Sequence, residues 1–567
     1  MHLSANMSRN RRASQKGFAL VLTSLMMVFI VSLMGMAVDA GVLFAVRGRL
    51  SAAADSAALA AARGVNHGLT AADANAKATD AATRFLKANL PDRYLGIDPA
   101  QTSLAATYEL SMDGNKPTGL LQVNVHAEVA APVYFMRFWG VSNVPVSVEG
   151  KATRRNLVLI IVLDKSASMG NRMTAPGTLP ASSPQQATSC ESMVSAASQM
   201  ADYFSPYDSV GLVSFDSTAS KDFPASTTFK SGGLKDSLSR LTCGNYTNTT
   251  AALEAAYQEI QRVDQKLAVN AVVLFTDGVP NAVNANFPLR SRPDTRWGPA
   301  LVPDSHPDAS NCRSDSRECQ NMPVVCPTGH HLGAIAQGAD FALASGLRVG
   351  LFKAFASDTP PPSFPTGCPA RDSVMASQSL AYIPETDRFG NSTRGPKDNW
   401  VFQVNRQCAP ADLPVTLGNS HCKNIGGEWS EFTGEWTGQS PGTNFFSAGP
   451  YAGKFRTDQA NAIGVVSTNT VINQAVRIRS DPAYRIRIDT IYLQGNGPDP
   501  VDRDFLPMVS NLRVIPPLPY QPSGTPTSEN PLYDPNLPEG RYTQTVNHLD
   551  LDRIFAETAA SLLRSSP

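Results

Sequence analysis

One stretch near the N-terminus restricts the fold of this chain more than any other feature. Residues 17–38, GFALVLTSLMMVFIVSLMGMAV, contain no charged side chain. A run of about 20 such residues is long enough to cross a bilayer as a helix. The basic residues that precede it are Arg9, Arg11, Arg12 and Lys16. This flank predicts that residues 1–16 stay in the cytoplasm and that the chain after Asp39 is exported.

A cleaved signal peptide is the alternative interpretation of the same run. Val38 and Ala40 are small enough for a signal peptidase to accept. The apolar core of a signal peptide is about 7 to 15 residues long, however, which is shorter than this run. We therefore expect an uncleaved, single-pass transmembrane helix.

The eight cysteines agree with an exported chain, because disulfides persist in oxidising compartments and an even number permits full pairing. We expect pairing within two sets. The first set is Cys190 and Cys243. The second set is Cys312, Cys319, Cys326, Cys368, Cys408 and Cys422. A zinc site that uses part of the second set with His330 or His331 is less favoured, because structural zinc ligands usually lie closer together in sequence.

Overall composition excludes some functions and bounds the number of domains. Lys plus Arg equals Asp plus Glu, at 48 each, so the chain has no bulk positive field that would attract nucleic acid. A length of 567 residues predicts several domains. The 42 Pro and 40 Gly residues are concentrated in the second half, which indicates much irregular structure there.

Residues 39–153 are predicted to form a stalk of helices and strands. Ala-rich segments at 41–65 and 71–90 predict two helices. We expect them to pack together as a hairpin, although their small side chains would also let a partner helix approach. From Thr102 to Thr153 apolar and polar residues alternate, which predicts a small β-rich element.

Three short apolar runs predict an α/β domain. LVLIIVLD, SVGLVSF and AVVLFTD are typical of strands that are buried on both faces of a mostly parallel sheet, and helical patterns separate them. The pattern covers residues 156–280 and resumes over 456–567, which ends in a helix. Residues 281–455 form a large Cys/Pro/Gly-rich insertion. The fold class is therefore α/β with a doubly wound, Rossmann-like sheet, whose ligands bind at the carboxyl ends of the strands.

Polar residues follow the strands at those ends. Asp164, Ser166 and Ser168 follow the first run, and Thr247 and Asp277 add two more oxygens from other loops. Such an oxygen set suits a hard divalent cation, Mg2+, Ca2+ or Mn2+, with water or an outside carboxylate completing the coordination. The alternative is that these side chains only cap helices and turns. Asp216 follows a strand that we expect at the edge of the sheet, and we interpret it as a loop residue.

The DKSAS motif, with Thr247 in YTNTTAAL and Asp277 in VVLFTDG, resembles the metal-ion-dependent adhesion site of von Willebrand factor A domains. The resemblance implies that the five residues hold a divalent cation whose open position accepts an acidic residue of a protein partner. The insertion between the fourth and fifth strands departs from the family pattern.

The N-terminal region, to about residue 65, is similar to TadG-like proteins of the Tad (tight adherence) Flp pilus assembly system, because an Ala-rich AADSAALAAA segment follows the apolar run. This resemblance implies a bacterial inner-membrane protein with its bulk in the periplasm or outside the cell. It also implies pilus assembly components, or a surface ligand, as partners. A free-standing adhesin and a structural protein with a vestigial metal site are the alternatives.

We do not expect an enzyme. Ser166, His330 and Asp277 could form a triad on paper, but no GxSxG motif surrounds any serine. No His or Glu adjoins DKSAS to act as a general base for metal-assisted hydrolysis. In the insertion, GEWSEFTGEW predicts a β-hairpin whose Trp429 and Trp436 fill a small core, with an exposed aromatic binding tip as the alternative.

Overall fold

A computed structural model places the chain in two compact units, and each is described by itself. The first holds the residues up to Arg155 together with Ser205–Tyr207, and the second holds Asn156–Phe204 and Asp208–Ser566. The structure describes residues 10–91, 93–98, 101–170, 187–231, 233–288, 330–342, 348–354, 374–375, 380–395, 406–407, 428–430, 435–436, 451, 453–457, 460–493, 505–516 and 528–564.

The first unit begins with one long helix, α1 (Asn10–Gly64). It contains the apolar run, with a mean hydropathy of 2.3 over its most apolar part, and it is long and apolar enough to cross a membrane. The first Ala-rich segment continues this helix without a break. The second forms α2 (Ala71–Asn89), which packs antiparallel against α1 through alanines such as Ala78. The two Ala-rich segments thus form the predicted helical hairpin.

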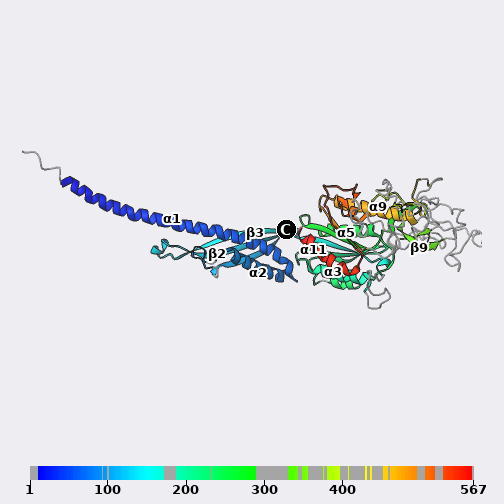
Figure 1. The fold of residues 1–567 in the computed structure, drawn as a ribbon, viewed down its shortest axis with the longest axis horizontal. Helices are drawn as coiled ribbons and strands as arrows, with labels where there is room; N and C mark the ends of the chain where they lie inside the picture. The colour runs from blue at the N-terminus through cyan, green and yellow to red at the C-terminus, as the bar shows by residue number, and fades with distance from the viewer. Residues whose placement is uncertain are drawn as a thin grey trace, which may run out of the picture. The chain divides into compact units, whose positions relative to one another are not determined.

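A three-stranded antiparallel sheet completes the first unit, in the order β1 (Ser103–Asp113), β2 (Lys116–Pro132) and β3 (Asn143–Arg155). Alternate residues of β2 are buried, as the period-two pattern predicts. The C-terminal half of α1 packs on β2 and β3 (Figure 1). The approach is close, because a Cβ atom on Gly150 would lie 2.4 Å from the carbonyl oxygen of Ala54.

A six-stranded sheet forms the centre of the second unit, in the order β18-β15-β7-β4-β5-β6. Neighbouring strands are parallel except for β6, which is antiparallel to β5. The strands are β4 (Leu157–Asp164), β5 (Ser209–Phe215), β6 (Ala219–Ser226), β7 (Val269–Thr276), β15 (Arg487–Leu493) and β18 (Tyr542–Thr545). The expectation that the strand before Asp216 lies at the sheet edge is wrong, since β6 covers β5.

Helices cover both faces of this sheet, as Figure 1 shows. Odd-numbered residues of β4, such as Ile161, pack against α3 (Ser189–Asp202) and α11 (Leu551–Arg564). Even-numbered ones, such as Ile160, pack against α5 (Thr249–Val263) and α9 (Ala460–Arg479). Burial on both faces explains why β4 is apolar at every position.

The segment between β7 and β15 contains a second sheet, which the sequence pattern did not predict. Its strands are β8 (Ala282–Pro288), β9 (His330–Ala342), β10 (Arg348–Ala354) and β11 (Val374–Met375), all antiparallel. Three further short strands, β12 (Arg406–Gln407), β13 (Glu428–Ser430) and β14 (Glu435–Trp436), form an antiparallel sheet. Trp429 pairs with Trp436 in register, as a hairpin requires; whether the two rings fill a core or form a binding tip lies outside the described side chains.

The six cysteines expected to bridge this insertion lie outside the described residues, so the description of the insertion as disulfide-rich has no structural support. The zinc alternative falls on the same cysteines. The remaining short elements are η1 (Val65–His67), η2 (Tyr94–Gly96), η4 (Met136–Trp139), η5 (Ala167–Gly170), α4 (Leu234–Ser239), α10 (Phe505–Val509), β16 (Val514–Ile515), β17 (Ser528–Glu529) and η8 (His548–Asp550).

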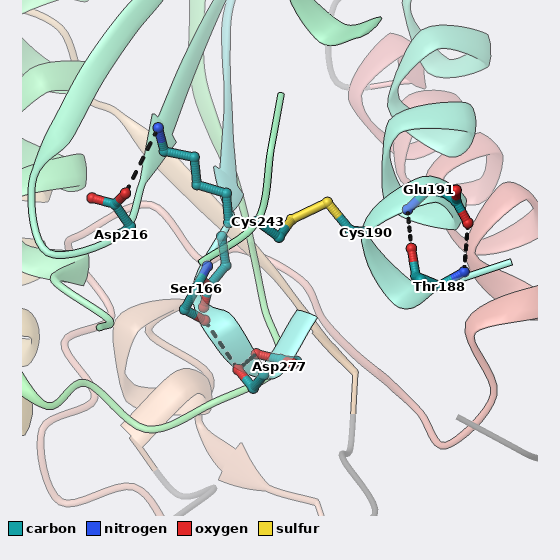
Figure 2. The surroundings of a disulfide bond; sticks show 10 residues. Ser166, Thr188, Cys190, Glu191, Asp216, Cys243 and Asp277 are labelled. Atoms are coloured by element: carbon teal, nitrogen blue, oxygen red, sulfur yellow. Dashed lines mark hydrogen bonds and ion pairs between the residues drawn. A yellow bond between two sulfur atoms is a disulfide. The ribbon is translucent and has the colours of Figure 1, made fainter. Parts of the chain in front are cut away.

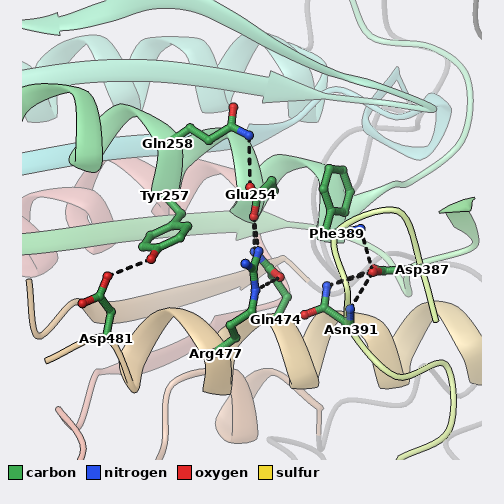
Figure 3. Close-up of polar contacts among 9 residues, drawn as sticks. All are labelled: Glu254, Tyr257, Gln258, Asp387, Phe389, Asn391, Gln474, Arg477 and Asp481. Carbon is green, nitrogen blue, oxygen red and sulfur yellow. Dashed lines mark hydrogen bonds and ion pairs between the residues drawn. The ribbon is translucent and has the colours of Figure 1, made fainter. Parts of the chain in front are cut away.

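A polar seam joins α9, which follows the insertion, to α5, which precedes it (Figure 3). Glu254 accepts hydrogen bonds from Gln474, at 2.7 Å, and from Arg477. One turn further along α5, the Tyr257 hydroxyl donates to Asp481 at 2.7 Å. These half-buried hydrogen bonds are directional, unlike the apolar packing between the two helices. They therefore fix the register of α9 along α5.

Two glycines of the second unit test how closely the backbone is packed at their positions. A Cβ atom on Gly540 would lie 1.8 Å from the carbonyl oxygen of Ile488, so Gly540→Ala must displace backbone. We expect it to lower the free energy of unfolding by about 1–3 kcal/mol. Gly464, inside α9, has open space, and Gly464→Ala is expected to raise that free energy by up to about 1 kcal/mol. Urea unfolding measures both, and equal effects would contradict this account.

Candidate functional site

Three loops meet at the carboxyl edge of the six-stranded sheet. β4 ends at Asp164, and β7 ends at Thr276, directly before Asp277. Because β4 and β7 are adjacent and parallel, their carboxyl ends lie side by side. The third loop precedes α5, whose N-cap residue is Asn248.

Hydroxyl and carboxylate oxygens from two of these loops are in direct contact. The Oγ atoms of Ser166 and Ser168 lie 3.0 Å apart, and Ser168 Oγ donates a hydrogen bond of 2.7 Å to Asp277 Oδ1. Figure 2 shows Ser166 and Asp277 on the two sides of this cluster. The structure thus brings together residues that are more than a hundred positions apart in the sequence.

Asp164 is fully buried at the base of the cluster. Its Oδ2 accepts a hydrogen bond of 2.5 Å from the Thr276 hydroxyl, and its Oδ1 accepts one of 2.8 Å from the backbone N–H of Ser166. Thr276 therefore fixes the orientation of Asp164. Sequence reasoning missed it, although a hydroxyl at the end of β7 that faces the end of β4 was the available signal.

Burial and nearby negative charge, that of Asp216 at Asp164 and that of Asp164 at Asp277, raise the pKa values of both carboxyl groups of the site. Burial, more than the other causes, raises the pKa of Asp277 to about 8, and the nearby charge of Asp164 raises it further. Burial also raises the pKa of Asp164 to about 6, against the hydrogen bonds from Thr276 and Ser166. The cation nearest in sequence, Lys165, instead forms an ion pair of 3.9 Å with Asp216. A bound cation would favour the ionised form of both carboxyl groups and so lower both pKa values.

Thr247 is buried and is held at this edge by the first strand segment of the insertion. Its backbone N–H donates to the Asn281 side chain at 2.8 Å, and its carbonyl accepts from the Asn281 N–H at 3.0 Å. The side-chain amide of Asn248 donates to the side-chain oxygen of Asn284 at 2.8 Å. Sequence reasoning missed both asparagines, because it interpreted residues after 280 as irregular. The insertion thus begins in direct contact with the candidate site.

The Thr247 loop is also tied to the DKSAS loop. The backbone N–H of Ala167 donates to the Asn245 carbonyl at 2.9 Å, and that of Gly244 donates to the Lys165 carbonyl at 2.7 Å. The Asp216 carboxylate accepts a hydrogen bond of 3.1 Å from the Asn245 side chain. Asp216 therefore contacts the loop that carries Thr247, and not the Ser166, Ser168 and Asp277 side chains.

A disulfide anchors the start of the same loop. Cys243 is bonded to Cys190, one residue inside α3, and this is the pairing expected from the sequence (Figure 2). Thr188 begins α3 with a capping box, in which its side chain accepts from the Glu191 N–H and Glu191 accepts from the Thr188 N–H. The disulfide therefore joins the Thr247 loop to a firmly capped helix end.

The donor chemistry of this edge fits a hard divalent cation. Every candidate ligand is an oxygen, from two carboxylates and three hydroxyls, as Mg2+ and Ca2+ prefer. Within the described residues, no group of three or more His, Cys, Asp or Glu side chains is placed to hold a metal ion. A cation here would thus depend on the serine and threonine hydroxyls in addition to the two acids. The metal stays a prediction.

The raised pKa values predict a pH dependence of the metal-free protein. A carboxyl group whose pKa is higher in the folded state destabilises that state once it ionises, so stability is greatest at low pH and falls as the pH rises towards the folded pKa. With chelator present, we expect the melting temperature of the second unit to fall as the pH rises from about 4 to about 8 because of Asp164 and Asp277. Calorimetry across this range tests the prediction. An Asp277→Asn variant with an equally steep fall would contradict it.

Two family models match separate parts of this chain. Residues 159–279 match the von Willebrand factor type A domain. Residues 17–64 match the Flp pilus-assembly TadE/G-like family. The chain therefore joins a TadE/G-like N-terminal segment to a von Willebrand factor type A domain. Among curated proteins, none matches the sequence.

Solved structures that match this chain come from several bacteria. The PilB minor pilin from Streptococcus sanguinis is 11% identical over 84% of this chain and 80% of its own, with a TM-score of 0.31. The vWF domain of the type V pili tip protein Mfa5 from Porphyromonas gingivalis is 13% identical over 73% of this chain and 98% of its own, with a TM-score of 0.29. Similarity at this level carries no argument about function.

Proposed function

We propose that this protein is a membrane-anchored, exported component of a Tad/Flp-type pilus system that binds a protein partner through a metal-ion-dependent adhesion site. The N-terminus lies in the cytoplasm, α1 spans the inner membrane, and the second unit works in the periplasm or outside the cell. The function is binding and not catalysis. The TadE/G-like match supports the pilus context, and the von Willebrand factor type A match supports the binding role.

The observation that carries the proposal is the contact between Ser168 and Asp277. It joins the DKSAS loop to the end of β7 by side-chain oxygens, at the edge of the sheet where α/β domains bind ligands. Asp164, Ser166, Ser168, Thr247 and Asp277 would hold the cation.

The bound cation would supply an open coordination position for a carboxylate of the partner. The residues of this chain perform the other tasks. Thr276 holds Asp164 in one orientation, and the disulfide and Asn281 hold the Thr247 loop at the same edge. The small sheet that begins at β8 lies beside the site and would contribute side chains to the partner contact.

Cross-linking in native membranes, followed by purification of the tagged full chain with Mg2+ or with chelator, tests the proposal. We expect pilus assembly proteins or pilins to be recovered with Mg2+ and lost with chelator. Asp277→Asn should lose them in both conditions. Asp202→Asn is the matched control. Asp202 lies at the end of α3 opposite the end that carries Cys190, and it pairs with Lys235 at 2.9 Å. Metal-dependent recovery of surface ligands without pilus proteins would instead favour a free-standing adhesin. Equal recovery of partners with Mg2+ and with chelator would refute the metal site.

A further inference from the structure

The connection between β2 and β3 exposes an unusual set of aromatic side chains. Residues 134–141, YFMRFWGV, are called the aromatic loop below. Phe138 is 87% exposed, Trp139 62% and Tyr134 53%. Isolated exposed apolar residues are common, but adjacent large aromatic side chains at this exposure indicate a surface that another apolar phase covers.

The aromatic loop is fastened to α1 by a buried carboxylate. Asp39 has no exposed surface, and its two oxygens accept hydrogen bonds from the backbone N–H groups of Tyr134, Phe135 and Met136 at 2.7 to 2.9 Å. These N–H groups begin the short helix η4, where they have no partner within the helix. The carboxylate thus fixes the position of the loop along α1.

A close packing contact fixes the same position a second time. A Cβ atom on Gly35 would lie 2.5 Å from the ring of Phe135, so the ring fits against α1 only because residue 35 has no side chain. Gly35 lies about one helical turn before Asp39. The loop therefore covers the last turn of the apolar run and the first charged residue after it.

This position is the level at which the proposed transmembrane helix leaves the bilayer. Trp and Tyr side chains are enriched at that level, where an apolar ring meets the lipid head groups. Arg137, in the middle of the loop, has a stem long enough to reach phosphate groups while its neighbours face the acyl chains. The contacts that set this depth all lie within the first unit, so no other protein is needed to bring the loop to the membrane.

We propose that the aromatic loop inserts into the lipid interface on the exported side of the membrane, beside α1. The inference rests on the proposed membrane anchor. It gives the first unit two attachments to the bilayer, the helix and the loop. Two attachments restrict the rotation and tilt of α1 in the bilayer, whereas a single helix would leave both free.

Tryptophan fluorescence of the full chain in phosphatidylcholine vesicles tests the proposal. The emission that Trp139→Phe removes is the emission of Trp139, and it is measured in plain vesicles and in vesicles whose lipids are brominated on the upper acyl chain. For a ring at the depth of interfacial side chains we expect this emission to be blue-shifted and to fall about twofold in brominated vesicles. Unchanged emission would overturn the proposal.

Two variants in the Trp139→Phe background separate this inference from the anchor. Phe29→Trp places a fluorophore within the apolar run, and we expect lipids brominated deep in the acyl chain to quench it. If they do not, the anchor fails and the inference fails with it; if they do and Trp139 is unquenched, only the inference fails. Leu69→Trp, at a residue that is 68% exposed beyond the far end of α1, should stay unquenched. Equal quenching there would show non-specific adsorption and overturn the proposal.

Discussion

Asp277→Asn is expected to abolish the stabilisation of the second unit by Mg2+ while making the metal-free protein at pH 7 more stable than the wild type. Asparagine keeps the oxygen that accepts the hydrogen bond from Ser168. Because burial and Asp164 raise the pKa of Asp277 to about 8, this group is already mostly neutral at pH 7 without metal. In the unfolded wild type the same group is ionised at pH 7, so a neutral replacement removes the cost of holding the proton in the folded state. Coordination needs the ionised form, so the variant loses a ligand that carries charge.

The size of the effect follows from mass action. A ligand present at 100 times its Kd stabilises a protein by about 2.7 kcal/mol. For a unit of about 400 residues that corresponds to a rise in melting temperature of roughly 3 °C. We expect this rise in the wild type and in Asp202→Asn, and no rise in Asp277→Asn. An equal Mg2+ response in Asp277→Asn would show that the cation binds elsewhere.

Removal of the disulfide should have the largest effect on stability. Cys190 and Cys243 are 53 residues apart in sequence, and a cross-link that closes a loop of this length stabilises a fold by about 4 kcal/mol in the chain-entropy description. Cys190→Ala combined with Cys243→Ala should lower the melting temperature of the second unit by roughly 5 °C. Urea unfolding with and without the substitutions measures the loss.

The same double variant should also weaken Mg2+ binding, because Cys243 directly precedes the loop that carries Thr247. Dithiothreitol gives the control. Dithiothreitol should lower the stability of the wild type at least to that of the untreated double variant. Any stability that the double variant itself loses in dithiothreitol comes from the other cysteines. An unfolding midpoint that the double substitution does not change would contradict the account.

The main strands of the sheet could be predicted because the burial of each strand determines its own residue pattern. A strand buried on both faces must be apolar at every position, and β4 is so up to Asp164. The edge position of β5 was predicted wrongly, because β6 has an atypical sequence for a strand. ASKDFPAS contains Lys221, Asp222 and Pro224, which are the residues that protect a sheet edge from further pairing.

Other features depend on contacts between distant parts of the chain. The sequence pattern divides this region into a transmembrane run and a separate Ala-rich helix, but α1 runs through both. Each glycine within α1 costs only about 1 kcal/mol, and packing on α2 and the small sheet offsets that cost. Thr276 and Asn281 support the site through side-chain directions that become visible only when β4, β7 and β8 are placed together. The five candidate ligands could be predicted because each follows a strand or precedes a helix within a recognisable motif.

The central claim is that one divalent cation binds at the carboxyl edge of the sheet. Electron paramagnetic resonance of Mn2+ added to the purified full chain tests it most directly, because it counts free and bound ions. The account predicts one bound Mn2+ per chain in the wild type and in Asp202→Asn, displaced by excess Mg2+, and none in Asp164→Asn or Asp277→Asn. Equal binding by all four proteins, or no binding by the wild type, would contradict it.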